Sequence, residues 1–188
     1  MPHIIQGERV FLRPFEPTDA EVYRRWRADA EPMVFAGWKD RAPLSLAQSA
    51  ARMDRLATDQ GKDYYTFMIC LLDDNRPIGE VGLSELDLRN GSASLGIFIG
   101  EVDEWGKGYG TDAVKAILGF GFDELRLERI WLEVWTENHR ARRAYEKAGF
   151  VFEATLRNDR YEGGRLTSGH VMSILRDEWL NLPSPPAR

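Results

Sequence analysis

The segment over residues 95–120 constrains the fold most, because a strand pattern runs through three closely spaced glycines into a helix pattern. Gly106, Gly108 and Gly110 allow the backbone to approach a ligand closely and to adopt positive φ angles. The first amides of the following helix lack partners within the helix and lie at the positive end of its dipole. A strand, a glycine loop and a helix N-terminus together favour a phosphate site. The alternative is a glycine-rich turn that only joins the two elements.

The spacing of these glycines excludes the two common nucleotide loops. A Walker loop requires G-x-x-x-x-G-K-[ST], but Lys107 is followed by Gly108, and Gly100 lies one residue too far upstream. A dinucleotide fingerprint requires G-x-G-x-x-G, whereas these glycines fall at alternate positions. Neither nucleotide loop therefore explains the segment.

Hydrophobic periodicity and turn residues predict the order β-α-α-β-β-β-α-β-α-β-β. Thr18 with Glu21, and Ser45 with Gln48, are spaced as capping boxes and begin the first two helices. The order implies an α/β (α+β) chain with a mixed sheet and helices on its faces. The predicted strands cover residues 10–14, 64–72, 78–88, 93–100, 130–134, 150–156 and 171–175.

Length and composition fit one globular domain. The chain has 188 residues, of which 43% are hydrophobic and 29% charged. We predict a single domain over residues 1–180 and a flexible tail over residues 181–188, which are rich in proline. The formal net charge of −5 argues against a nucleic-acid partner.

Cysteine usage and the absence of apolar targeting segments predict the compartment. Cys70 is the single cysteine and lies in an apolar run, which favours a core position and a reducing environment. The N-terminus lacks the apolar region of a secretory signal, and no stretch approaches the roughly 20 apolar residues that span a bilayer. We therefore expect a cytoplasmic protein without a membrane partner. The histidines are scattered without metal-ligand spacing, so no metal is expected.

Two ordered motifs carry a family resemblance. The glycine loop reads Trp105-Gly-Lys-Gly-Tyr-Gly110, close to the pattern [QR]-x-x-G-x-[GA] with tryptophan in the first position. Downstream, Asn138 opens a helix, Tyr145 follows seven residues later, and Gly149 precedes a phenylalanine. In these features the chain resembles the GNAT N-acetyltransferases, particularly the branch that acetylates ribosomal proteins and polyamines. The resemblance extends over residues 10–179.

This resemblance implies a GNAT-like mixed sheet, splayed between the strand before the glycine loop and the strand over residues 128–135. It implies acetyl-coenzyme A as cosubstrate, with the pantetheine arm inserted between the splayed strands. Backbone groups of residues 98–100 would pair with that arm, and the amides of residues 106–111 would hold the pyrophosphate. The implied cofactor-binding residues are Phe98, Ile99, Gly100, Trp105, Gly106, Lys107, Gly108, Tyr109, Gly110, Thr111, Asn138 and Arg143.

The resemblance also assigns catalytic residues. Tyr145 lies where the family places its general acid, and a phenol can protonate a departing thiolate. By periodicity alone, a core aromatic on the inner face of its helix is the favoured interpretation. Glu80 is the first candidate for the general base and Glu101 the second, and a solvated strand carboxylate is the alternative for both.

The acceptor is predicted only as a primary amine, either of a small molecule or of a protein N-terminus. Phe35 and Trp38 lie in the predicted loop over residues 31–43 and are candidates for the acceptor pocket. Arg140 and Arg142 accompany Arg143 in a basic run, which suits either coenzyme phosphates or a solvated helix face. The rival functions are a non-catalytic acyl-coenzyme A sensor and an RNA-binding protein using the basic run. The resemblance leaves a homodimer open.

Overall fold

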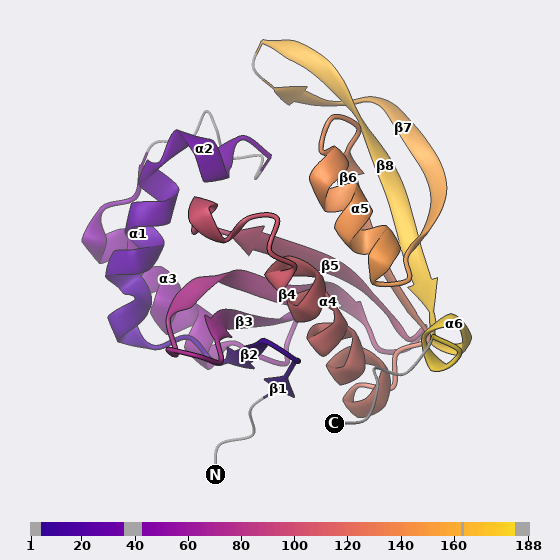
Figure 1. Ribbon diagram of the computed structural model, residues 1–188, viewed down its shortest axis with the longest axis horizontal. Helices are drawn as coiled ribbons and strands as arrows, with labels where there is room; N and C mark the ends of the chain where they lie inside the picture. The colour runs from indigo at the N-terminus through magenta and orange to yellow at the C-terminus, as the bar shows by residue number, and fades with distance from the viewer. Residues whose placement is uncertain (1–4, 36–42, 163, 183–188) are drawn as a thin grey trace.

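The computed structural model describes residues 5–35, 43–162 and 164–182. The described strands form one eight-stranded mixed sheet in the order β1-β2-β3-β4-β5-β6-β8-β7, with helices on both faces (Figure 1). This confirms the predicted fold class. The strands are β1 Ile5–Gln6, β2 Val10–Arg13, β3 Tyr64–Leu71, β4 Pro77–Asp87, β5 Ser92–Ile99, β6 Arg129–Trp135, β7 Val151–Glu162 and β8 Arg165–Leu175.

The described α-helices are α1 Ala20–Ala28, α2 Ala30–Met33, α3 Leu46–Thr58, α4 Tyr109–Gly119, α5 His139–Lys147 and α6 Arg176–Leu180. Short 3₁₀ turns cover Pro17–Asp19 and Val102–Glu104, and a π-helical turn over Phe120–Glu124 continues α4. The strand β1 and the short helices α2 and α6 were not predicted, because two to five residues carry too little periodicity. None of the described helices is long and apolar enough to cross a membrane.

The first helix begins differently from the prediction. The capping box of Thr18 and Glu21 is wrong, because the chain already turns at Pro17, and the Asp19 carboxylate accepts the backbone N–H of Glu16 at 2.8 Å. Arg13 then holds that carboxylate through two hydrogen bonds of 2.7 and 2.8 Å. Proline sets the backbone angle that starts a helical turn, so the boundary follows the proline.

The second predicted capping box is confirmed at α3. The Ser45 hydroxyl accepts the N–H of Gln48 at 3.1 Å, and the Gln48 side chain accepts the N–H of Ser45 at 2.8 Å. Behind this cap, Met53 and Leu56 are buried against the sheet. Satisfying these end amides fixes where α3 starts and therefore which face it turns inward.

The last hairpin is longer than predicted. β7 runs to Glu162 rather than residue 156, and β8 begins at Arg165 rather than residue 171. The added residues extend past the end of β6, as the arching hairpin in Figure 1 shows. Polar side chains suit strands solvated in this way, so the alternation that marks a half-buried strand is weak there.

Two hydrophobic clusters fill the two faces of the sheet. The larger one packs α4 and α5 against residues such as Val81, Leu83 and Ile130. The smaller one packs α1 and α3 around Tyr23 and Trp26, and Cys70 is fully buried in it. The prediction of Cys70 as a core residue is confirmed. In the predicted tail, Asn181 donates its side-chain N–H to the carbonyl of Asp177 at 2.7 Å and Leu182 packs on the larger cluster, while residues 183–188 lie outside the described residues.

The sheet opens between β5 and β6, which run parallel. The two strands pair only at their beginnings, over residues 92–94 of β5 and 129–131 of β6. Beyond Ser94, β5 continues beside β4, whereas β6 continues beside β8. The predicted splay is confirmed, and it leaves one edge of β5 without a neighbouring strand. Sheet edges of this kind present unpaired backbone N–H and C=O groups.

Candidate active site

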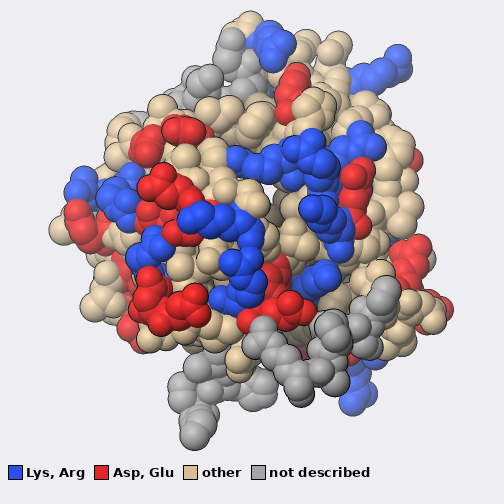
Figure 2. Space-filling model, viewed as in Figure 1, with Lys and Arg blue, Asp and Glu red and all other residues tan. Residues whose placement is uncertain are grey.

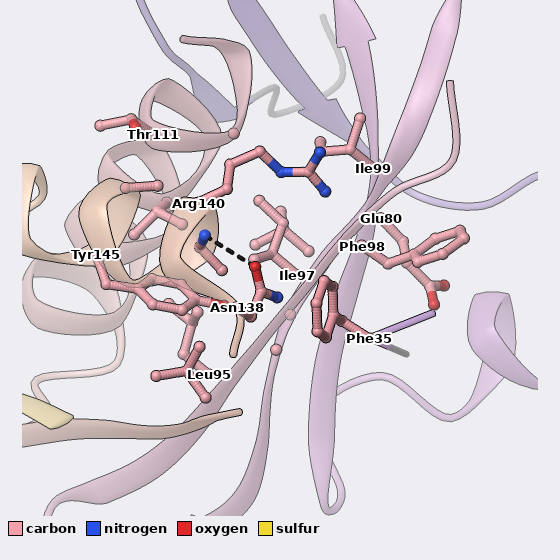
Figure 3. A pocket seen from close by; sticks show the side chains of 18 of the residues that line it. Phe35, Glu80, Leu95, Ile97, Phe98, Ile99, Thr111, Asn138, Arg140 and Tyr145 are labelled. Atoms are coloured by element: carbon pink, nitrogen blue, oxygen red, sulfur yellow. Dashed lines mark hydrogen bonds between the residues drawn. The ribbon is translucent and has the colours of Figure 1, made fainter. Parts of the chain in front are cut away.

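A cavity of about 700 Å³ lies where β5 and β6 separate. One wall comes from β4, β5 and the glycine loop, and the opposite wall comes from the end of β6 and from α5 (Figure 3). The volume falls in the range of small-molecule and cofactor sites. The predicted site residues Phe98, Ile99, Trp105, Gly106, Gly108, Gly110, Thr111, Asn138, Arg143, Tyr145 and Glu80 all line this cavity.

The glycine loop turns sharply into α4. Gly106 and Gly108 have φ angles of 77° and 91°, which side-chain-bearing residues rarely adopt. Gly108 is the N-cap of α4 and supplies no side chain to bond the first amides. Those amides therefore remain available at the positive end of the helix dipole, beside the cavity.

Replacing Gly108 with alanine should weaken binding of acetyl-coenzyme A about tenfold, because the left-handed backbone then costs about 1–2 kcal/mol. The added Cβ meets only an arginine nitrogen at 3.6 Å, so strain rather than a clash causes the loss. Calorimetric titration measures the dissociation constant. Gly164→Ala is the matched control, since Gly164 has a φ of 81° in the distant β7–β8 turn. Equal effects of both substitutions would contradict a ligand-holding loop.

Side chains of the loop hold its shape rather than line the cavity. Lys107 is paired with Glu104 at 2.9 Å, and its carbonyl accepts the guanidinium of Arg9 at 2.5 Å. Arg9 also lies 4.3 Å from the ring centre of Tyr109. The predicted residues Lys107 and Tyr109 are therefore not among the residues that line the cavity, and the Lys107 carbonyl and the Tyr109 ring fix the loop against Arg9.

The predicted pairing of a ligand with Gly100 needs correction. The N–H of Gly100 donates to the carbonyl of Ile78 at 2.9 Å, so it belongs to the sheet. A Cβ at this glycine would lie 2.3 Å from the ring of Trp26, which explains the residue type. Because strand backbones alternate direction, Phe98 also points its N–H and C=O toward β4, while Ile97 and Ile99 face the gap. The open edge is therefore formed by Ile97 and Ile99.

Trp105 occupies part of this edge. Its indole N–H donates to the carbonyl of Ile99 at 3.0 Å. The guanidinium of Arg140, from the other wall, lies 3.5 Å from the indole ring centre. The pair spans the cavity between the glycine loop and α5, and burial lowers the pKa of Arg140 below its ordinary value.

Tyr145 projects from α5 into the cavity. Asn138 begins this helix by accepting the N–H of Ala141 at 3.1 Å, which confirms its prediction as an N-cap. The Tyr145 ring packs 5.8 Å from that of Phe150 and is only 6% exposed. Within the described part of the chain its hydroxyl has no hydrogen-bond partner. Burial raises the pKa of Tyr145 to about 12, so the phenol stays protonated at neutral pH.

Glu80 lies on the other side of β5 from Tyr145 (Figure 3). It is 7% exposed, and among the described residues its Oε2 is buried without a hydrogen-bond partner. Burial raises the pKa of this carboxyl above its ordinary value, an effect reduced by the nearby guanidinium groups of Arg52 and Arg27. A raised pKa suits a group that must accept and release a proton.

Glu101, the second candidate base, is already engaged. Its carboxylate is paired with Arg25 and accepts the indole N–H of Trp26 at 2.8 Å. Burial alone would raise its pKa, but these two hydrogen bonds bring the pKa below its ordinary value. Glu101 is therefore the weaker base, and it serves to connect α1 with the end of β5.

The basic run on α5 divides between two environments. Arg142 pairs with Glu146 at 2.9 Å on the outer surface, whereas Arg140 and Arg143 line the cavity together with Lys147. Figure 2 shows Lys and Arg side chains gathered around a hollow on this face of the molecule. The run is thus not one continuous patch, and its inner members suit an anionic ligand inside the cavity.

Sequence reasoning missed Arg52 of α3, which also lines the cavity. Met53 and Leu56 mark the inner face of α3, and Ser49 interrupts that face one turn earlier. The available signal was therefore a polar residue, Ser49, at a position where the apolar face of α3 should continue, which indicates a polar site beside that face. Phe35 lines the cavity as predicted and contacts the ring of Trp135 at 5.9 Å, whereas Trp38 lies outside the described residues.

Comparisons with known proteins agree with this geometry. Residues 9–151 match the family model described as acetyltransferase (GNAT) domain. An N-acetyltransferase of Bacillus licheniformis is 29% identical over 92% of this chain and 96% of its own length. The spermidine N(1)-acetyltransferase of Escherichia coli is 27% identical over 91% and 88%. The structure of spermidine N-acetyltransferase from Vibrio cholerae with CoA and spermine has a TM-score of 0.80 at 26% identity, covering 92% of this chain and 98% of that one.

Proposed function

Because this chain belongs to the GNAT acetyltransferase family, we propose that Tyr145 and Glu80 are the general acid and general base of its acetyl transfer. The chain is an acetyl-coenzyme A-dependent N-acetyltransferase, which moves an acetyl group onto an amine. One observation supports the assignment of residues. The splayed strands bring an open strand edge, a buried phenol and a buried carboxylate to a single cavity.

The cavity residues fit the groups of a coenzyme A thioester. The free amides at the start of α4, with Arg140, Arg143 and Lys147, suit its phosphates. The backbone groups of Ile97 and Ile99 suit its pantetheine amides, which can add to β5 as a further strand does. Asn138 keeps its side-chain N–H groups for the same ligand. The thioester supplies an activated acetyl group.

The chemistry follows from the placement of the two ionisable groups. Glu80 accepts a proton from the substrate ammonium, through water where the distance requires it. The amine nitrogen then forms a bond to the acetyl carbon, the carbon–sulfur bond breaks, and Tyr145 supplies a proton to the sulfur. The second proton that the nitrogen loses as it becomes an amide returns through water to the Tyr145 oxygen. Since the pKa of Tyr145 is about 12 and that of a thiol about 8.5, full proton transfer is uphill. We therefore expect Tyr145 to act first as a hydrogen-bond donor to the developing thiolate.

The acceptor is proposed to be a small-molecule amine rather than a protein N-terminus. Relatives named spermidine N-acetyltransferases support this class, since their names give a small amine. The cavity is bordered by both α2 and α5, which also favours a small acceptor. The homodimer is still a prediction, and sedimentation equilibrium tests it by measuring the molar mass of the protein in solution.

Calorimetric titration tests the donor site directly. We expect micromolar binding of acetyl-coenzyme A, and much weaker binding of ATP, which lacks the pantetheine arm. Desulfo-coenzyme A should also bind but support no transfer. A screen of primary amines with detection of released thiol then tests transfer. Absence of acetyl-coenzyme A binding, or binding without turnover of any amine, would refute the proposed function.

A further inference from the structure

The cavity contains two oppositely charged side chains, Glu80 buried and Arg52 half-buried, that the acetyl transfer does not fully explain. Glu80 reaches it from β4 and Arg52 from α3. Within the described residues, both Glu80 Oε2 and Arg52 Nε are buried without a hydrogen-bond partner. The two side chains form no ion pair with each other among those residues, although the charge of Arg52 partly offsets the rise that burial causes in the pKa of Glu80. Leaving opposite charges buried and unpaired is costly unless a ligand or water joins them.

Arg52 is held in place by an aromatic ring rather than by a carboxylate. Its guanidinium lies 5.4 Å from the ring centre of Tyr23, which is fully buried. Arg27 of α1 contacts the same ring at 5.8 Å and donates to the Tyr23 hydroxyl at 3.3 Å. Tyr23 therefore positions two cations near Glu80. This arrangement leaves the hydrogen-bond donors of Arg52 available toward the cavity.

The charges lining the cavity disfavour a polycationic acceptor. Glu104 and Glu133 are engaged with cations of the chain, so Glu80 is the lining carboxylate without an ion-pair partner among the described residues. The lining cations are Arg52, Arg140, Arg143, Lys147 and Arg160. A polyamine brings several positive charges, of which Glu80 could balance one. Arg160 is paired with Glu133, and Arg140, Arg143 and Lys147 are assigned to the coenzyme phosphates, so Arg52 is the lining cation that would repel the other charges of a polyamine.

We propose that the acceptor is an α-amino acid, whose carboxylate binds Arg52 and whose α-amine binds and is deprotonated by Glu80. This inference rests on the proposed function and names its substrate class. An α-amino acid carries its ammonium and its carboxylate on one carbon, so it can satisfy both buried groups at once. Arginine presents several N–H donors in a plane and binds carboxylates with two parallel hydrogen bonds. The acetyl group moves to the α-nitrogen as described above.

The test compares acceptors that differ only at the carboxylate. Proteinogenic L-amino acids, their C-terminal amides and their decarboxylated amines are assayed beside spermidine by release of coenzyme A thiol. The comparison uses the amino acid whose side chain is preferred. We expect kcat/KM of its free acid to exceed that of its amide and its amine by about tenfold to a hundredfold, because one charge-assisted hydrogen-bonded pair contributes a free energy of that size. The amide also represents a protein N-terminus.

Variants of α3 separate recognition of the carboxylate from stability. Arg52→Gln should reduce to about one the ratio of kcat/KM for the free acid to kcat/KM for the matched amide, and Arg52→Lys should retain part of this preference. Arg55→Gln, an exposed arginine on the same helix, should retain all of it. If Arg52→Gln does not fold, the ratio of kcat/KM for the free acid to kcat/KM for the amide, measured in the wild-type enzyme and in Arg52→Lys, still tests the proposal.

The two proposals fail in different ways. Turnover of amides, amines or spermidine at least as fast as of the free acids would overturn the inference and leave the acetyltransferase function intact. Binding of acetyl-coenzyme A without turnover of any acceptor would overturn both.

Discussion

Replacing Tyr145 with phenylalanine is expected to lower kcat about 10²–10⁴-fold, the usual contribution of a positioned proton donor. The ring would stay packed against Phe150, so the change removes only the hydroxyl. The dissociation constant for acetyl-coenzyme A should remain within about twofold of wild type, because the hydroxyl contacts the sulfur only as charge develops. Steady-state kinetics at saturating amine, combined with calorimetry, measures both quantities.

The matched control is Tyr161→Phe, because Tyr161 is 70% exposed on β7. That variant should keep full activity. Since the pKa of Tyr145 is about 12, its ionisation should not appear in a pH–rate profile below about pH 10. Full turnover by Tyr145→Phe with a saturating amine would show that the phenol is a core aromatic only.

Replacing Glu80 with glutamine is expected to lower kcat/KM for the amine at least about 100-fold at neutral pH, since a general base contributes 10²–10⁴-fold. Burial raises the pKa of Glu80, so the acid limb of the wild-type profile should lie above the range of an exposed carboxyl. The variant should lose this limb. Its remaining activity should rise with pH only as the free amine does. Measurement of kcat/KM across pH 5–9 decides this.

The stability of the same variant should also depend on pH. A carboxyl whose pKa is higher in the folded state than its ordinary 4.5 keeps its proton more readily when folded. Folding is therefore destabilised as pH rises from that ordinary value through the folded pKa. Glu80→Gln removes this loss, so its melting temperature relative to wild type should be higher at pH 8 than at pH 4.

Glu85→Gln serves as the control, because Glu85 lies on the same strand but is exposed. It should change neither the acid limb nor the pH dependence of melting. If Glu80→Gln retained the wild-type pH profile, the general base would be another group or water alone, and the assignment of Glu80 would be wrong.

Much of the fold was predictable because its signals are local. Glycines at alternate positions between a strand and a helix required the loop at Gly106 and Gly108, where positive φ angles are observed. Ser45 and Gln48 fixed the start of α3, since capping acts over three residues. The hairpin β7–β8 was shortened in the prediction, because its outer part is largely exposed and the positions that are buried there, Thr167 and Gly169, give no apolar alternation.

The site was predictable only in part, because some of its features depend on contacts between residues far apart in the sequence. Tyr145 and Asn138 follow from a motif within one short helix. The sequence could not tell that the Gly100 amide is bonded to Ile78, because strand pairing decides which backbone groups face the gap. The sequence ranked Glu80 before Glu101 as the base but could not show which carboxylate has partners. Arg25 pairs with Glu101 and Trp26 donates a hydrogen bond to it, whereas Glu80 Oε2 is buried without a hydrogen-bond partner among the described residues.

The sequence by itself determined the family, the glycine loop and the position of Tyr145 on its helix, since each depends on residues close together along the chain. Only the tertiary structure showed which charged side chains meet on the proposed acceptor side of the cavity. Arg52 and Glu80 are 28 positions apart, and only the folded chain, in which Met53 and Leu56 of α3 join the smaller cluster, brings both to one cavity. Charge pairing depends on distances in space, so buried groups without partners become visible only once the chain has folded.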